Sequence, residues 1–115
     1  EESQLPQFDQ EEIFSRGDFL ATGTVFKKSS FLSIGGYNQS TKNCGLENYE
    51  LILRMILKGK KGVLNSENLF SYRLHSKSMS SERSDDLISY GTKLCKEFSI
   101  DDYRTNKFHP YKLKI

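Results

Sequence analysis

The strongest helical pattern in the chain covers residues 46–58. Its apolar side chains recur at helical spacing: Leu46, Tyr49, Leu53, Ile56 and Leu57. Gly59 follows as a stop signal. Three further apolar positions widen the stripe: Leu51, Ile52 and Met55. A stripe of this width predicts a helix that is buried on more than one side.

A second long helix is predicted over residues 81–98, where apolar residues again form one stripe. Ser80 or Ser81 would cap it, and acidic residues suit its positive end. Shorter helices are expected over residues 10–15 and 29–34. Gly35 and Gly36 would end the latter, because glycine readily adopts the left-handed backbone found after helices.

Three segments carry the pattern of strands instead. Residues 19–26 are rich in β-branched and aromatic side chains, and Gly23 inside that run indicates a bulge or a close approach by another backbone or a ligand. Residues 60–65 and 69–74 form two further short runs. The expected fold class is therefore α/β, with a short mixed sheet packed against the two main helices at about 46–58 and 81–98.

Composition excludes several classes of protein. The 115 residues suffice for one domain or part of one, and the net charge of +2 does not favour nucleic-acid binding. A basic, aromatic stretch over residues 103–114 is read as a solvated tail. No apolar run reaches the length of a membrane span. Two cysteines, Cys44 and Cys95, cannot form a disulfide framework, although one bridge between them stays open.

Polar chemistry concentrates in two segments. Residues 45–54 place Glu47, Asn48 and Glu50 in the first turn of the predicted helix, where the acids would either serve a site or simply complement the helix dipole. Residues 72–80 include the end of the predicted strand 69–74 and hold the second set: Arg73, His75, Lys77, Ser78 and Ser80. His75 could instead be solvated or structural. Arg73 could instead form an ion pair with Glu47 or Glu50.

Taken in order, segments 22–28, 31–37, 45–54 and 72–80 resemble the C-terminal, acceptor-side half of family 2 glycosyltransferases. These enzymes use nucleotide sugars and have the GT-A fold. The resemblance spans about residues 18–80. It implies a parent protein that transfers a sugar to a saccharide or glycoconjugate acceptor in polysaccharide biosynthesis, with Mg or Mn as its divalent cation.

The resemblance also implies roles for single residues. Glu47 and Asn48 occupy the family's Glu-Asp pair, whose second member is the usual catalytic base. A carboxamide cannot accept that proton at neutral pH, which leaves Glu47 as the first candidate base and Glu50, one turn further along the helix, as a weaker one. The remaining alternative is a site that only binds. His75 would be a metal ligand or a phosphate donor. Phosphate or substrate contacts would come from Arg73, Lys77, Ser78 and Ser80.

The chain departs from the family pattern in its first part, which has no D-x-D motif and no glycine-rich phosphate loop. It is therefore expected to be a partial domain, inactive alone, with a lead-in (1–17), a transferase-like region (18–80) and a helix with a tail (81–115). The expected location is cytoplasmic, with any membrane association made by other regions. The alternative is a non-catalytic module that binds carbohydrate or protein. The face left by the absent half would favour self-association.

Overall fold

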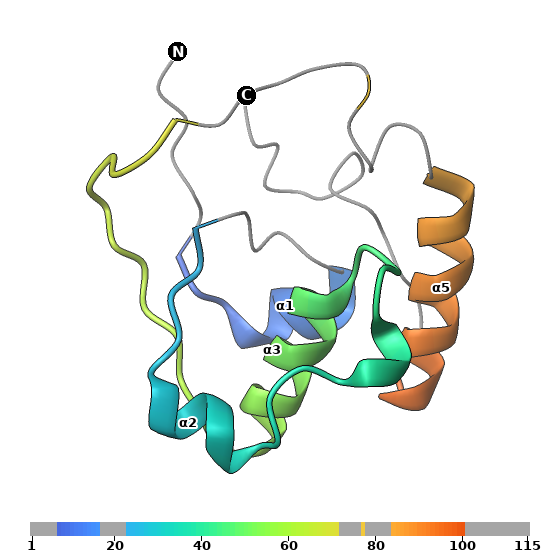
Figure 1. Ribbon diagram of the computed structural model, residues 1–115, viewed down its shortest axis with the longest axis horizontal. Helices are drawn as coiled ribbons and strands as arrows, with labels where there is room; N and C mark the ends of the chain where they lie inside the picture. Colours follow the sequence, from blue (N-terminus) through green and yellow to red (C-terminus); the bar gives the residue numbers. More distant parts are fainter. Residues whose placement is uncertain (1–6, 17–22, 72–76, 78–83, 101–115) are drawn as a thin grey trace.

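The computed structural model describes residues 7–16, 23–71, 77 and 84–100. Within these ranges the chain folds into α-helices and one 3-10 turn, in the order α1 (Gln10–Arg16), α2 (Lys28–Ser33), η1 (Gln39–Thr41), α3 (Glu47–Leu57) and α5 (Ser84–Glu97). Figure 1 shows α3 near the centre, with α5 running beside it. The predictions of two short helices and of a helix over 46–58 are confirmed. The predicted helix over 81–98 is confirmed from residue 84 onward.

The central helix α3 is buried on several sides, as its wide apolar stripe predicts. Tyr49, Leu51, Leu53 and neighbouring residues have almost no exposed surface. The helix ends at Leu57, and Gly59 follows its C-cap with a φ of +70°, a left-handed conformation that glycine adopts without strain. The Gly59 N–H donates to the Ile56 carbonyl at 2.8 Å, and the Lys60 N–H reaches the Met55 carbonyl at 3.0 Å. This pair of bonds is a Schellman motif, which satisfies carbonyls at the helix end.

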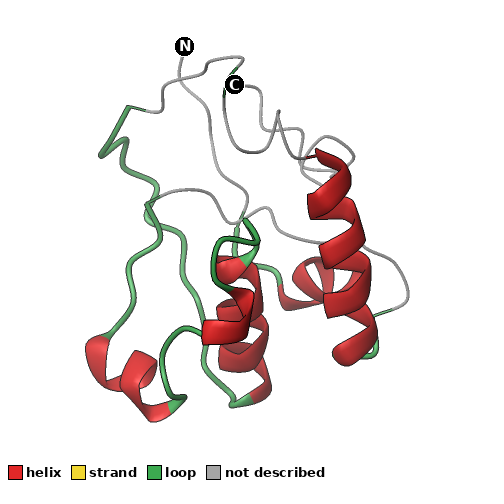
Figure 2. Ribbon diagram, turned by 45° about the vertical axis from the view of Figure 1, so that its right-hand side comes forward, coloured by secondary structure: helices red, strands yellow, loops and turns green. Residues whose placement is uncertain are grey.

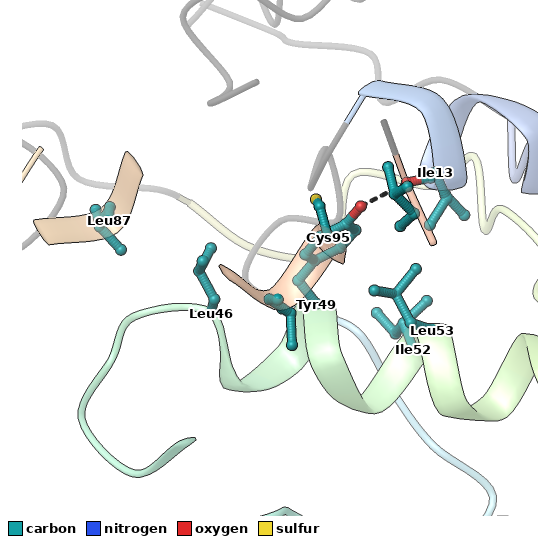
Figure 3. Packing of buried hydrophobic residues seen from close by; sticks show 9 residues of the cluster. Ile13, Leu46, Tyr49, Ile52, Leu53, Leu87 and Cys95 are labelled. Carbon is teal, nitrogen blue, oxygen red and sulfur yellow. Dashed lines mark hydrogen bonds between the residues drawn. The ribbon is translucent and has the colours of Figure 1, made fainter. Parts of the chain in front are cut away.

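The hydrophobic core lies where α3 meets α1 and α5. Its buried members are Ile13, Leu46, Tyr49, Ile52, Leu53, Leu87, Leu94, Cys95 and Ile100. Figure 3 shows the Tyr49 hydroxyl pointing to the backbone of Ile13, to whose carbonyl it donates a buried hydrogen bond of 2.8 Å. The bond joins α3 to α1. It also gives a partner to two polar groups, the Tyr49 hydroxyl and the Ile13 carbonyl, that cannot reach water because they are buried.

The α/β prediction is wrong for the described part of the chain, which contains no strand (Figure 2). Residues 23–27 and 60–71 are loops instead. A strand exists only through hydrogen bonds to a neighbouring strand, and β-branched residues favour it mainly by packing on a half-buried surface. Here Val25 and Val63 are 92% and 93% exposed, so nothing described covers them. Residues 17–22 and 72–76 lie outside the described residues.

These two loops nevertheless touch each other. The Cα of Gly23 faces the ring of Phe70, and a Cβ placed there would come within 2.5 Å of a ring carbon. Gly62 lies against the ring of Phe8 in the same way. The group close to Gly23 is thus a side chain, and not the other backbone or the ligand expected from the sequence. The contact brings together segments that are far apart in the sequence.

Two further findings concern the described residues. Cys44 and Cys95 are not joined by a disulfide, so the bridge left open by the sequence is not formed. No described helix combines the length and apolar character that crossing a membrane requires.

Replacing Tyr49 with Phe should lower the free energy of unfolding by about 1–2 kcal/mol, because the buried Ile13 carbonyl loses its donor. Urea unfolding followed by circular dichroism measures the change. Tyr90→Phe is the matched control, since the Tyr90 hydroxyl makes only a long, exposed bond of 3.4 Å to the Ser40 carbonyl. Equal losses in the two variants would contradict the assigned role of the Tyr49 bond.

Candidate functional site

The guanidinium of Arg54 joins α3 to the end of α2. Its Nε and Nη2 donate to the two carboxylate oxygens of Glu50 at 2.6 and 2.8 Å. The same guanidinium also donates to two backbone carbonyls. Nη1 donates to the Ile34 carbonyl at 2.8 Å, and Nη2 donates to the Gly36 carbonyl at 2.7 Å. A planar fork of donors suits such a bidentate pair, so one side chain fixes the turn after α2 against α3.

This pairing also explains how an acidic side chain can be buried. Glu50 has only 3% of its surface exposed, and an unpaired carboxylate would be costly there. Arg54 neutralises it, and the Asn38 amide adds a long bond of 3.5 Å to the same carboxylate. Glu50 is therefore a structural residue. Its partner is Arg54, one helical turn away. Arg73, the partner considered from the sequence, lies outside the described residues.

The exposed start of α3 carries the two residues predicted to be catalytic. Asn48 is exposed, and its Oδ1 accepts a hydrogen bond of 2.7 Å from the Tyr37 hydroxyl. Glu47 is half-buried and forms no ion pair with any residue that the structure describes. Glu47 and Asn48 are thus adjacent on the first turn, with one side chain engaged by Tyr37.

Tyr37 closes the segment 31–37, directly after the two glycines that end α2, and the structure places its ring against Phe31. Its ring makes an edge contact with Phe31, with centroids 5.4 Å apart and planes at 70°. Phe31 in turn lies close to Gly36, which has a φ of +68°. The sequence signal for this arrangement is weak, because it depends on the glycine turn that directs the chain back toward α3.

The loop that leads into α3 is ordered by its own side chains. Asn38 Oδ1 accepts bonds from the Ser40 backbone N–H at 3.0 Å and from the Ser40 hydroxyl at 2.8 Å. Further along, the Cys44 thiol accepts from the Leu46 N–H at 3.3 Å. Short polar side chains commonly stabilise turns in this way. The loop therefore holds Tyr37 and the start of α3 in a defined relation.

The second predicted segment is largely outside the described residues. Arg73, His75, Ser78 and Ser80 belong to that undescribed part, and Lys77, which is described, is exposed. The structure thus brings Asn48 together with Tyr37, with Glu47 as the preceding residue of α3. The predicted phosphate contacts and the His75 metal role stay predictions.

The described residues do not form a site for the Mg or Mn that the resemblance implies. Among them, no three His, Cys, Asp or Glu side chains gather around one point. Glu47 and Glu50 share a turn, yet Glu50 is already bound to Arg54. No reaction step through a metal is derived from these side chains.

Comparison with known proteins gives no relative: no family model matches the chain, and no match is found among curated proteins or solved structures.

Replacing Arg54 with Met should lower the free energy of unfolding by about 3–5 kcal/mol, because it leaves the buried Glu50 carboxylate unpaired. Urea unfolding measures this loss. The double variant Glu50→Gln/Arg54→Met should recover a substantial part of it, since no buried charge then remains. A double variant no more stable than Arg54→Met would show that the ion pair is not the source of the effect.

Stability should also fall at alkaline pH through Cys44. Burial raises the pKa of this thiol above its ordinary value of 9.0, and the nearby charges of Glu47 and Glu50 add to the rise. The folded state therefore disfavours the thiolate. The stabilisation is complete below the ordinary thiol pKa and is lost as pH rises toward the higher folded pKa. Thermal unfolding between about pH 7.5 and 10.5 should show a falling midpoint.

Cys44→Ser is the matched control for this pH dependence. A serine hydroxyl can still accept the Leu46 N–H but does not ionise in this range. The variant should lose less stability on going to alkaline pH. Some loss should remain, because burial also raises the pKa of Tyr90 above 10.0. Identical pH profiles in the variant and the natural protein would exclude Cys44 as a source.

Proposed function

We propose that this chain is the acceptor-side region of a nucleotide-sugar-dependent glycosyltransferase, and that Glu47 contacts the acceptor hydroxyl. The order of the sequence segments supports the class of enzyme. The observation that carries the site is the start of α3, where a half-buried carboxylate adjoins an exposed amide bound to an aromatic hydroxyl. The proposal depends on these residues and requires no sheet within the described part.

The proposed reaction is a single displacement. Glu47 accepts the proton of an acceptor hydroxyl, whose oxygen forms a bond to the anomeric carbon of the donor sugar. The bond from that carbon to the nucleoside diphosphate breaks, and the diphosphate leaves with the electron pair. A divalent cation bound to the donor would stabilise this leaving charge. The donor site and the cation site are proposed to lie in other parts of the parent protein.

Asn48 fits a binding role better than a chemical one. Its Oδ1 is already occupied by the Tyr37 hydroxyl, and an amide does not take up a proton at neutral pH. Glu47 is the carboxylate beside it without an ion-pair partner among the described residues. Glu50 is a poor substitute because it is buried and bound to Arg54. The base is therefore assigned to Glu47.

The same engagement of Asn48 favours a second candidate function. An amide at the position of the usual base, held by a neighbouring tyrosine, suits a module that binds saccharides without transferring them. Amide and carboxylate groups can together bind sugar hydroxyls, since the amide donates and the carboxylate accepts. This module would share the binding surface of the first candidate and differ from it in catalysis.

A transfer assay on the complete product of the gene distinguishes the two functions. The protein is incubated with Mg or Mn, a panel of nucleotide sugars and saccharide acceptors, and sugar transfer is followed by mass spectrometry. The natural protein should transfer sugar, and Glu47→Gln should reduce kcat by about 100-fold or more, the usual contribution of a general base. Asn48→Asp is the companion variant, because it restores a carboxylate at the neighbouring position.

Three results would change the assignment. Undiminished turnover in Glu47→Gln would place the base elsewhere. A large rate increase in Asn48→Asp, with little effect of Glu47→Gln, would mean that the natural residue has replaced the base. No transfer by the natural protein, together with saccharide binding, would favour the non-catalytic module.

A further inference from the structure

Tyr37 combines features that are unusual for a surface side chain. It is a large aromatic residue with 41% of its surface exposed, and yet it is held at several points. The hydroxyl donates to Asn48, and the ring edge meets Phe31. The residue before it, Gly36, is fixed through its carbonyl by Arg54. An exposed ring is thus fixed in orientation from both ends.

The polar groups beside this ring are complementary in their hydrogen-bonding capacity. An asparagine amide offers one acceptor oxygen and two N–H donors. Because the Tyr37 hydroxyl occupies Oδ1 of Asn48, the side chain presents mainly donors to an incoming ligand. Glu47, the residue before it, presents a carboxylate that only accepts. The ring therefore lies next to an amide donor, and the residue that precedes this amide on the same helical turn carries an acceptor.

These groups suit a cyclic sugar. A pyranose has a face of C–H groups, which can lie on an aromatic ring, and a rim of hydroxyls that both donate and accept. Burial of that apolar face against a flat ring is favourable. A ring that is already oriented loses little conformational freedom on binding, which increases affinity. Neither the ring nor the polar pair alone would distinguish a sugar from other polar ligands.

We infer that Tyr37 is the stacking platform for a pyranose, with the Asn48 amide and the Glu47 carboxylate binding its hydroxyls. Tyr37 then determines specificity through the sugar face that can lie on it, and Asn48 orients the ring. The inference rests on the proposed function for the class of ligand. It adds a residue to which the sequence motif assigned only a turn.

Direct binding to the 115-residue chain tests this role without any requirement for transfer. Methyl β-D-glucopyranoside and methyl β-D-galactopyranoside are the cyclic probes, and sorbitol is an acyclic polyol with similar hydroxyls. Binding is followed by NMR at the ring protons of Tyr37 and the side-chain amide of Asn48. At least one pyranoside should shift both sets of signals in a saturable manner, and sorbitol should shift neither.

Two variants separate the ring from its hydroxyl. Tyr37→Leu keeps apolar bulk against Phe31 but removes the flat face, so affinity should fall by about tenfold or more. Tyr37→Phe keeps the face and loses the bond to Asn48, so a smaller loss of about two- to fivefold is expected. Phe70→Leu is the matched control, because it removes another exposed ring, one that lies against Gly23. It should bind as the natural protein does.

Each contrary result is distinct. Unchanged affinity in a folded Tyr37→Leu variant, checked by thermal unfolding, would overturn the platform role while leaving the proposed transfer reaction intact. Equal binding of sorbitol, or no pyranoside binding by the natural chain, would also overturn it. If Tyr37→Leu does not fold, Tyr37→Phe and the ring-proton shifts decide, since absent shifts contradict stacking. Failure of the transfer assay with preserved stacking would overturn only the enzymatic proposal.

Discussion

The ion pair between Glu50 and Arg54 is the interaction on which the described site depends. At the end of α2 the N–H groups of Gly35 and Gly36 satisfy the last helical carbonyls, and the turn that follows carries further carbonyls beside α3. Arg54 supplies donors to Ile34 and Gly36 at this end while it neutralises a buried acid. One guanidinium therefore meets two requirements, the charge of Glu50 and the hydrogen bonds of the turn.

The position of Tyr37 follows from that arrangement. It directly follows Gly36, so the backbone entering it is fixed by Arg54, while its hydroxyl is fixed by Asn48 on α3. The buried ion pair thus determines the position of the exposed Tyr37 side chain through a few residues. A buried charge pair adds little net stability, because desolvation of the two charges offsets their attraction. Its main effect here is to fix the position of the turn after α2.

The helices could be predicted from the sequence because their signal is local. Apolar spacing defined the segment that became α3, and glycines marked its end and that of α2. Strands depend on partners elsewhere in the chain, and β-branched content around Val25 and Val63 carries no information about whether a partner is present. The predicted sheet failed for this reason.

The candidate site divides in the same way. The placement of Glu47 and Asn48 at a helix start could be predicted, because position along a helix follows from its bounds. The Glu50–Arg54 pair has the spacing of neighbours on a helix face and was detectable in principle. The carbonyls that accept from Arg54 could not be predicted from the sequence, because every residue has a backbone carbonyl. Only the folded turn places those of Ile34 and Gly36 within reach of the guanidinium.

The contacts of Gly23 with Phe70 and of Gly62 with Phe8 carry an evolutionary consequence. Each ring occupies the volume that a side chain at the glycine would need, so the two positions of a pair cannot vary independently. Drift toward a larger residue at 62 is open only to lineages in which the aromatic at position 8 has first become smaller, whereas at 23 the φ of +103° disfavours a side chain even when the ring is smaller. Homologous sequences should therefore show positions 8 and 62 covarying in size, although dozens of residues separate them.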